Sequence, residues 1–315
     1  MPDTRKVMLI GCGMVGMSYA YALLNQNIVD ELVLVDVNKD KAMGEAMDLN
    51  HGLAFASSSM KIYAGDYSDA KDADIVVIAA GVNQKPGESR IDLLGRNTAV
   101  FKSIIEPVVA SGFSGIFLIA TNPVDVMSQI TLKLSGFSPD KVIGSGTTLD
   151  TARLRYLIGA KLKIDPRNVH AYVIGEHGDS EFVPWSQAHV STVSLDEIKA
   201  KNPDRDSDFD MSEIEVEVRE AAQKIIAAKN ATYYGIGMAL VRITRAIFSN
   251  EHSILTISSL VDGEYGISGA YLGLPCIVGR EGRIKLIELD LNNEEHKKLE
   301  HSAAVIKDAF SCIQF

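Results

Sequence analysis

The sequence predicts an α/β protein with a doubly wound parallel sheet, followed by an α+β part with antiparallel strands. Three observations predict this fold: short apolar runs alternate with helix-like stretches up to about residue 147, a glycine-rich turn follows the first run, and the pattern then changes. At 315 residues, the chain is long for a single hydrophobic core. We therefore expect two domains, spanning residues 1–147 and 148–315.

The first half contains six short apolar runs, which read "KVMLIG", "ELVLVD", "KIYAG", "DIVVIAAG", "GIFLIATNP" and "KVIGSG". Runs that are apolar throughout are typical of strands buried on both faces. The stretches between them leave room for crossover helices, so these runs predict the parallel sheet.

The second half begins with the helical pattern "LDTARLRYLIGAKL" and a strand that leads to His177. A polar loop, "KAKNPDRDSDFD", precedes a long helical region from about residue 211 to 250, which we expect to bend near Gly235 and Gly237. The segments "ILTISSLVDGEYGI" and "LPCIVGREGRIKLIEL" predict antiparallel strands with "REGR" as a turn. A charged amphipathic helix ends the sequence.

Composition argues against several classes of protein. A net charge of -10 without a basic cluster argues against nucleic-acid binding, which needs a basic face to neutralise phosphates. Cys12, Cys276 and Cys312 have no metal-like spacing, so we expect no metal site and a reduced, cytoplasmic chain. The apolar run after Lys6 is interrupted by glycines and is short for a membrane span, so we expect no membrane association.

A G-x-G-x-x-G pattern at Gly11, Gly13 and Gly16 follows the first run and precedes a helix. Asp36 lies twenty residues beyond Gly16, at the end of the second run. In a Rossmann sheet such glycines admit a pyrophosphate to the helix N-terminus, and the carboxylate accepts hydrogen bonds from ribose hydroxyls. Because Asp36 would repel a 2′-phosphate, the pattern favours NAD over NADP. Flavoproteins and non-redox nucleotide binders carry the same signature.

The stretch "VIGEHGDSEF" places His177 between acidic residues and glycines, directly after an apolar run. Imidazole exchanges protons near neutral pH, which makes His177 a candidate catalytic residue, although a polar residue that ends a strand is an alternative interpretation. Asp150 and Arg153 are three residues apart on a predicted helix and so share a face, where they could form an ordinary surface ion pair.

Six motifs give this sequence a resemblance to a known family. The segments "GCGMVG", "NQKPGESR", "ATNPVD", "TTLDTARLR", "GEHGDSEF" and "NATYYGIG" occur in the order found in the L-lactate dehydrogenase family, and the resemblance covers essentially the whole chain. The sequence is most similar to bacterial members. The resemblance implies a cytoplasmic homotetramer that uses NAD to interconvert pyruvate and L-lactate.

The resemblance also implies roles for the candidate residues. His177 would exchange a proton with the substrate oxygen while Asp150 supports the imidazolium. Arg153 would bind the substrate carboxylate through parallel hydrogen bonds. Arg90, in a loop expected to close over the substrate, would polarise the carbonyl group. Asn122 and Thr232 match further substrate-binding positions, and Asn122 would also contact the cofactor.

Gln84 is the residue that carries the specificity argument. Similar malate dehydrogenases have an arginine at this point, where it pairs with the second carboxylate of oxaloacetate, and a neutral glutamine would leave that charge unpaired. Pyruvate and lactate are therefore the expected substrates. A dehydrogenase for bulkier acids such as 2-hydroxyisocaproate stays open as an alternative, as do a malate dehydrogenase and a non-catalytic structural protein of the same fold.

Further positions follow from the resemblance alone. The remaining cofactor-lining positions are Val15, Lys41, Tyr67, Gly81, Ser103, Ser145 and Ile236. Arg155 and His170 match the pair that helps bind fructose 1,6-bisphosphate in allosterically activated bacterial members. Arg155 lies about 200° around the helix from Arg153, so it would point away from the active site. A surface arginine and a packed histidine are the alternative interpretation of this pair.

Overall fold

The computed structural model describes residues 4–57, 59–82, 90–201 and 210–315, and it contains one large sheet and one small sheet. The large sheet has nine strands in the order β12-β11-β10-β6-β5-β4-β1-β2-β3. Its six parallel strands are β1 (Lys6–Ile10), β2 (Glu31–Val35), β3 (Lys61–Ala64), β4 (Ile75–Ile78), β5 (Ile116–Ile119) and β6 (Val142–Gly144). Each of the six apolar runs therefore contains one strand, as predicted.

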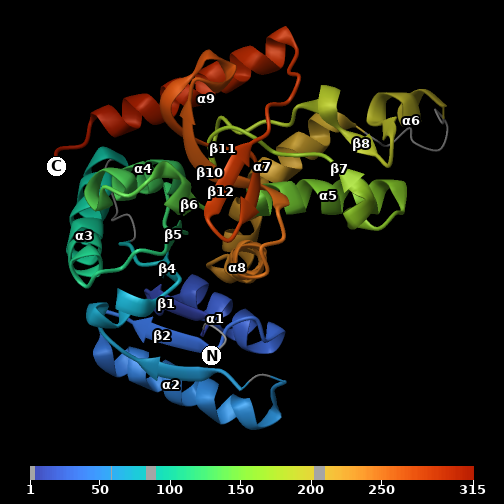
Figure 1. Cartoon of the computed structure of the whole chain (residues 1–315). Coiled ribbons are helices and arrows are strands. Elements are labelled where there is room, and N and C mark those ends of the chain that lie inside the picture. Colours follow the sequence, from blue (N-terminus) through green and yellow to red (C-terminus); the bar gives the residue numbers. More distant parts are fainter. Residues whose placement is uncertain (1–3, 58, 83–89, 202–209) are drawn as a thin grey trace.

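Four helices connect the parallel strands (Figure 1). They are α1 (Met14–Gln26), α2 (Lys39–Gly52), α3 (Arg90–Ala110) and α4 (Val124–Ser135). The chain changes direction between β1 and β4, which places α3 and α4 on the opposite face of the sheet from α1 and α2. The doubly wound arrangement is confirmed.

The antiparallel strands extend the same sheet. They are β10 (Ser253–Asp262), β11 (Ser268–Gly279) and β12 (Gly282–Leu286), and Ser258 of β10 pairs with Gly144 of β6. The expected domain boundary at residues 147 and 148 falls between β6 and the helix α5 (Thr148–Leu162). The later strands thus return to the edge of the parallel sheet.

The remaining elements of the described chain are a small sheet, four helices and six short turns, of which β7, α7 and η4 pack against α5. The small antiparallel sheet consists of β7 (Val169–His170), β8 (His189–Val190) and β9 (Val193–Ser194). The other helices are α6 (Leu195–Lys201), α7 (Met211–Lys229), α8 (Tyr234–Phe248) and α9 (Asn293–Ser311). Short 3-10 turns are η1 (Leu53–Phe55), η2 (Tyr67–Asp72), η3 (Pro139–Lys141), η4 (Pro166–Asn168), η5 (Trp185–Gln187) and η6 (Glu264–Gly266). Within the described ranges, we find no helix both long and apolar enough to cross a membrane.

One helical region differs from the prediction. The region from about residue 211 to 250, expected to bend near Gly235 and Gly237, is two helices separated by residues 230–233, so the break begins at Asn230. Asn230 adopts the left-handed conformation with a φ of 68° and donates its backbone N–H to the Ile226 carbonyl. Asparagine tolerates this conformation better than most residues, and it ends a helix as glycine does. Gly237 instead lets α8 pack against the backbone of Ser18 in α1.

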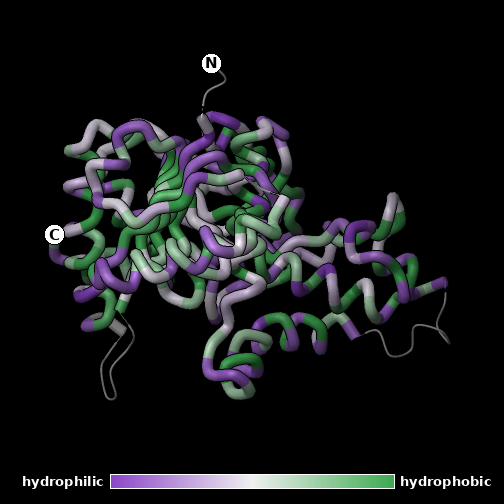
Figure 2. Tube along the Cα trace, turned by 90° about the horizontal axis from the view of Figure 1, so that it is seen from below, coloured by the Kyte–Doolittle hydropathy of each residue, from purple (hydrophilic) through white to green (hydrophobic). Residues whose placement is uncertain are grey.

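Most of the buried apolar side chains form one core around the large sheet. Strands β1, β4 and β5 are buried along their whole length, as strands covered on both faces must be. Figure 2 shows many hydrophobic segments gathered in the interior of the larger part of the molecule, with many hydrophilic segments toward its outside. A smaller cluster joins α5, β7 and α7 through Leu154, Val169 and Ile214. The rigid sheet thus carries the segments that follow its strands.

Candidate active site

The predicted cofactor residues follow the carboxyl ends of the parallel strands. Gly11 follows β1, Asp36 follows β2, Gly81 lies just beyond β4, Asn122 lies beyond β5, and Ser145 follows β6. Strand order changes direction between β1 and β4, and this switch point is where open parallel sheets bind ligands. The structure therefore places these five residues along one edge.

The glycines of the G-x-G-x-x-G turn allow backbone segments to pack closely and leave space for a ligand beside the backbone. Gly11 has a φ of 104°, and a side-chain carbon there would lie 2.6 Å from the Ala80 nitrogen. A side-chain carbon at Gly16 would overlap the Gly11 carbonyl oxygen. At Gly13, by contrast, a side-chain carbon would meet no protein atom within 4 Å. Gly13 precedes the first residue of α1, so the open space beside it fits a pyrophosphate at the helix N-terminus.

Asp36 is fixed by the backbone around it. Its Oδ2 accepts the Cys12 N–H at 2.8 Å, and its Oδ1 accepts the Asn38 N–H at 2.9 Å. Each carboxylate oxygen can accept a second hydrogen bond, so the side chain can still bind ribose hydroxyls. The residues present at this edge fit NAD.

The other predicted cofactor-binding residues differ in their exposure to solvent. Val15 of α1, Tyr67 of η2 and Ile236 of α8 are half-buried, whereas Ser145 is buried. Lys41 and Ser103 are exposed, and the Ser103 hydroxyl donates to the Val100 carbonyl of its own helix. The roles of these residues stay predictions.

A hydrogen-bonded chain of three side chains forms the centre of the candidate active site. His177 Nδ1 donates to Asp150 Oδ2 at 2.7 Å, and Arg153 Nη1 donates to Asp150 Oδ1 at the same distance. Both Asp150 and Arg153 project from the first turns of α5, and the Asp150 side chain is only 2% exposed. Because Nδ1 is occupied, Nε2 is the ring nitrogen that can meet a substrate.

Three elements hold the backbone that carries His177. Gly175 exchanges two hydrogen bonds with Gly273 of β11, at 3.0 and 2.8 Å. The next N–H, from Glu176, donates to the Ser302 hydroxyl of α9, and the His177 N–H donates to Asp125 Oδ2 of α4 at 2.7 Å. The segment predicted as a strand is largely such irregular backbone, since β7 ends at His170.

Charge around His177 favours its protonated form. Burial acts to lower the pKa of His177, but the Asp150 carboxylate outweighs burial and raises the pKa to about 9. For Asp150 itself, burial acts to raise the pKa, while His177 and Arg153 together lower it. The pair is therefore an imidazolium held beside a carboxylate at neutral pH.

Glu181 is a second acidic neighbour that sequence reasoning gave no role. Its Oε2 lies 4.0 Å from His177 Nδ1, and burial raises the pKa of its carboxyl to about 8. Glu181, Asp150 and His177 offer atoms close enough together for a metal ion. Both Asp150 oxygens, however, already accept hydrogen bonds from His177 and Arg153, so we interpret the cluster as a proton-transfer site.

The remaining substrate candidates are only partly described. Asn122 is exposed at the carboxyl edge and is joined to Pro123 by a cis peptide bond. Thr232 is half-buried in the connection between α7 and α8. Gln84 lies outside the described residues. The described part of Arg90 is its backbone, which begins α3.

Arg155 lies on a different side of α5 from Arg153, and His170 lies in β7. Arg155 Nε donates to the Ala171 carbonyl at 3.0 Å, one residue beyond the exposed His170. The Arg155 guanidinium also lies over the Tyr172 ring, 5.2 Å from its centre. A cavity of about 290 Å³ beside it is lined in part by Arg155, Arg167, Arg242 and Tyr172. The predicted divergence of Arg153 and Arg155 is thus present.

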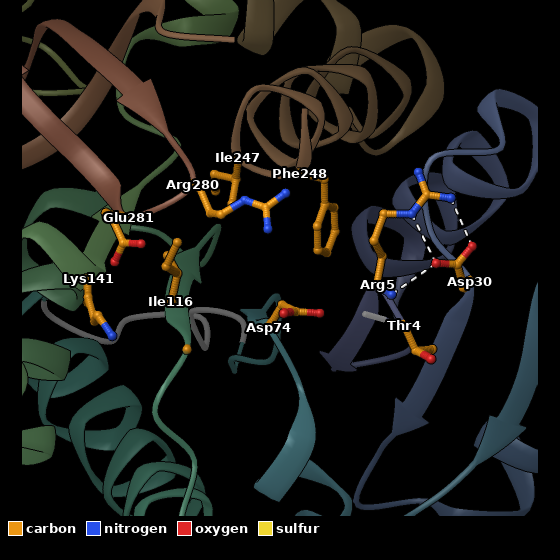
Figure 3. Close-up of a pocket in the computed structure, with 11 residues that line it drawn as sticks. Thr4, Arg5, Asp30, Asp74, Ile116, Lys141, Ile247, Phe248, Arg280 and Glu281 are labelled. Carbon is orange, nitrogen blue, oxygen red and sulfur yellow. Dashed lines mark hydrogen bonds and ion pairs between the residues drawn. The ribbon is translucent and has the colours of Figure 1, made fainter. Parts of the chain in front are cut away.

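A larger cavity of about 630 Å³ lies at the other edge of the sheet (Figure 3). Its lining includes Arg5, Asp74 and Lys141, which directly precede β1, β4 and β6 at the amino ends of these strands. Figure 3 shows Arg5 bound to Asp30, an ion pair of 2.8 Å. The lining balances three basic residues with three acidic ones, so its charge selects no ligand.

Comparison with known proteins agrees with the geometry. Residues 5–144 match the model of the lactate/malate dehydrogenase NAD binding domain, and residues 147–314 match that of the lactate/malate dehydrogenase alpha/beta C-terminal domain. The chain belongs to the lactate/malate dehydrogenase family. It is an NAD-dependent oxidoreductase, and the resemblance found in the sequence is confirmed.

Similar proteins cover almost the whole chain. L-lactate dehydrogenase 1 of Peribacillus psychrosaccharolyticus is 53% identical over 97% of this chain and 96% of its own length. An L-lactate dehydrogenase of Geobacillus sp. is 54% identical over 98% of this chain and 96% of its own length. The crystal structure of a lactate dehydrogenase from a Medee basin deep-sea metagenome library has a TM-score of 0.97 and 52% identity, with 99% of this chain and 100% of that chain covered.

Proposed function

We propose that this protein is an L-lactate dehydrogenase that interconverts pyruvate and L-lactate with NAD. The single observation that carries the proposal is the chain of hydrogen bonds joining His177, Asp150 and Arg153 beside the dinucleotide edge. His177 can act as a proton donor and Arg153 can bind a carboxylate, and Asp150 holds both side chains. Reduction of a 2-oxo acid requires these two groups. The L-lactate dehydrogenases similar to this chain support the same choice.

In the proposed mechanism, His177 supplies the proton. Its Nε2 donates to the substrate oxygen during pyruvate reduction and accepts the proton back during lactate oxidation. Asp150 holds the ring through Nδ1 and stabilises the imidazolium. When bound, NADH supplies the hydride that the keto carbon receives.

Arg153 would bind the substrate carboxylate. Its Nη1 donates one bond to Asp150, and a guanidinium has five N–H donors, so others can form two parallel bonds to a carboxylate. We assign Arg90 to the carbonyl oxygen and Asn122 and Thr232 to the substrate pocket because they match the family motifs.

We propose fructose 1,6-bisphosphate as an activator that binds near Arg155 and His170. The cavity lined by Arg155, Arg167 and Arg242 supports this assignment, because guanidinium groups bind phosphates in parallel pairs. Wild-type protein should gain activity when the bisphosphate is added, and Arg155→Gln should lose that response while keeping its basal turnover. A response that survives in Arg155→Gln would place the effector elsewhere.

We further propose that the protein is a homo-oligomer, which is a tetramer by family resemblance, and that it is located in the cytoplasm. Large apolar side chains are exposed on α1, η1 and α8, where Tyr21, Phe55 and Met238 are each more than half exposed. Such residues are typical of surfaces that pack against a second copy. The three cysteines are free, as in proteins of reducing compartments.

Initial rates of NADH oxidation with three substrates test the proposed function. Pyruvate should be reduced fastest, because neutral Gln84 provides no partner for the second carboxylate of oxaloacetate. Faster turnover of 2-oxoisocaproate would instead favour the alternative with bulkier substrates, and faster turnover of oxaloacetate would contradict the Gln84 argument. Absence of turnover with all three would support the non-catalytic alternative.

A further inference from the structure

Asp125 has a buried carboxylate near the candidate active site, and although it ends the "ATNPVD" motif, the proposed mechanism gives it no role. It lies in the first turn of α4, which begins directly after Pro123. Its Oδ2 accepts the His177 N–H at 2.7 Å, and its Oδ1 accepts the Ser258 hydroxyl of β10 at 2.5 Å. One side chain thus connects three segments that are distant in sequence.

The environment of Asp125 indicates a specific role. The residue is 1% exposed, and burying a carboxylate is costly unless it is hydrogen-bonded. Among the three N–H groups that anchor the loop, at Gly175, Glu176 and His177, only that of His177 donates to a charged acceptor. Bonds to a charged group are shorter and stronger than bonds between neutral groups.

We propose that Asp125 is a positioning residue for His177, whose main chain it holds through one carboxylate oxygen while adding a further negative charge near the imidazolium. The inference rests on the proposed function, because it assumes that His177 is the proton donor. Asp125 is buried and its two oxygens accept from the His177 N–H and the Ser258 hydroxyl, so it would act through His177. Ser258 fixes the orientation of the carboxylate from the sheet.

The charged groups around Asp125 support the second part of the proposal. Burial raises the pKa of Asp125 to about 6, while the hydrogen bonds from Ser258 and His177 act to lower it and nearby Glu176 acts to raise it. The groups facing His177 are Asp150, Glu181 and Asp125, and each favours the imidazolium. Because His177 titrates near pH 9, Asp125 is ionised over that range.

Two substitutions separate the two proposed roles of Asp125, which are to hold the main chain of His177 and to add negative charge near its ring. Asp125→Asn retains an oxygen that can accept the His177 N–H and an amide that can bond to Ser258, but it removes the charge. Asp125→Ala removes the charge and both bonds. As a matched control, Thr131→Val changes another fully buried polar residue of α4, whose hydroxyl bonds only to the Met127 carbonyl of the same helix.

The experiment measures pyruvate reduction by full-length protein from pH 6 to 10, NADH binding by fluorescence, and unfolding by denaturant. Asp125→Ala should lower kcat about 10- to 100-fold with NADH affinity retained, because small displacements of a catalytic group are costly. Asp125→Asn should recover most of that loss at pH 7, while its rate falls at a lower pH than in the wild type. Thr131→Val should keep the wild-type kcat and pH profile.

Each result decides a part of the inference. Wild-type kcat in folded Asp125→Ala would overturn the holding role, and a wild-type pH profile in Asp125→Asn would overturn the charge. If Asp125→Ala does not fold, the profile of Asp125→Asn decides. His177→Gln is measured in parallel: if it keeps wild-type turnover, the proposed function fails, whereas a slow His177→Gln with unaffected Asp125 variants rejects only the inference about Asp125.

Discussion

His177 is the residue whose protonation should set the pH dependence of the reaction. Its pKa is raised from 6.5 to about 9, so the imidazolium form is complete at neutral pH and is lost as pH rises through 9. We expect kcat/KM for pyruvate to be flat near pH 7 and to fall above about pH 9, and kcat/KM for lactate to rise over the same interval. Initial rates from pH 6 to 10 measure both. A midpoint near 6.5 in both directions would contradict the stabilising role of Asp150.

Replacing His177 should separate chemistry from cofactor binding. His177→Gln removes the titrating group, and general acid–base catalysis contributes about 10²- to 10⁴-fold, so turnover should fall by roughly that factor. NADH affinity, measured by fluorescence titration, should stay close to that of the wild type, since the glycine-rich turn is unchanged. Equal loss of turnover and NADH affinity would indicate that His177 is a structural residue.

At the residue scale, the sequence predicted the groups that lie within hydrogen-bond distance of one another. Asp150 and Arg153 could be paired because helical spacing of three residues places both on one face. Asp125 and Glu181 lie within quoted motifs, but their burial depends on packing against β10 and α7, which no local pattern reveals. Burial of a carboxyl group is the signal that would have found them.

At the element scale, the turn between β1 and α1 has two kinds of glycine. Gly16→Ala should lower the unfolding free energy by about 1 to 3 kcal/mol, because its side-chain carbon would overlap the Gly11 carbonyl oxygen. Gly13 has a φ of -79° and open space around it, so Gly13→Ala should change stability by no more than about 0.5 kcal/mol. The same change should weaken NADH binding about tenfold or more, since the added methyl group occupies the space assigned to pyrophosphate.

Denaturant unfolding and NADH titration of the two glycine variants check these expectations together. Gly13→Ala is the decisive variant, because it should weaken NADH binding without changing the stability of the fold. Unchanged NADH affinity in Gly13→Ala would show that the pyrophosphate does not lie over this end of α1.

Helices and strands could be predicted to different extents. The six apolar runs identified every parallel strand, because burial on both faces leaves a clear sequence pattern. The helical region from residue 211 to 250 was predicted to bend near Gly235 and Gly237, whereas the left-handed residue that ends α7 is Asn230, which is not a glycine. The pairing of β10 with β6 is a long-range contact that periodicity does not specify.

At the scale of the whole molecule, one sheet connects the cofactor edge to the catalytic loop. Gly175 is bonded to Gly273 of β11, β11 pairs with β10, and β10 pairs with β6 at Gly144. His177 is therefore held by the same nine strands that carry the glycine-rich turn. The sheet would thus hold the proposed proton donor and the proposed cofactor site in one frame, which favours a fixed geometry for the reaction.

The exposed apolar side chains predict how complete molecules assemble. Tyr21 of α1 and Phe55 of η1 line the same groove of about 510 Å³, and Phe55 is 94% exposed. Burying such groups against a second copy is favourable, whereas a charge buried without a partner is not. Phe55→Asp should therefore lower the molar mass measured by light scattering after size-exclusion chromatography. Ile284→Asp, which changes an apolar residue exposed on β12, is the matched control and should keep the wild-type mass. A wild-type protein that elutes as a single chain, or an unchanged mass in Phe55→Asp, would show that this groove is not an interface.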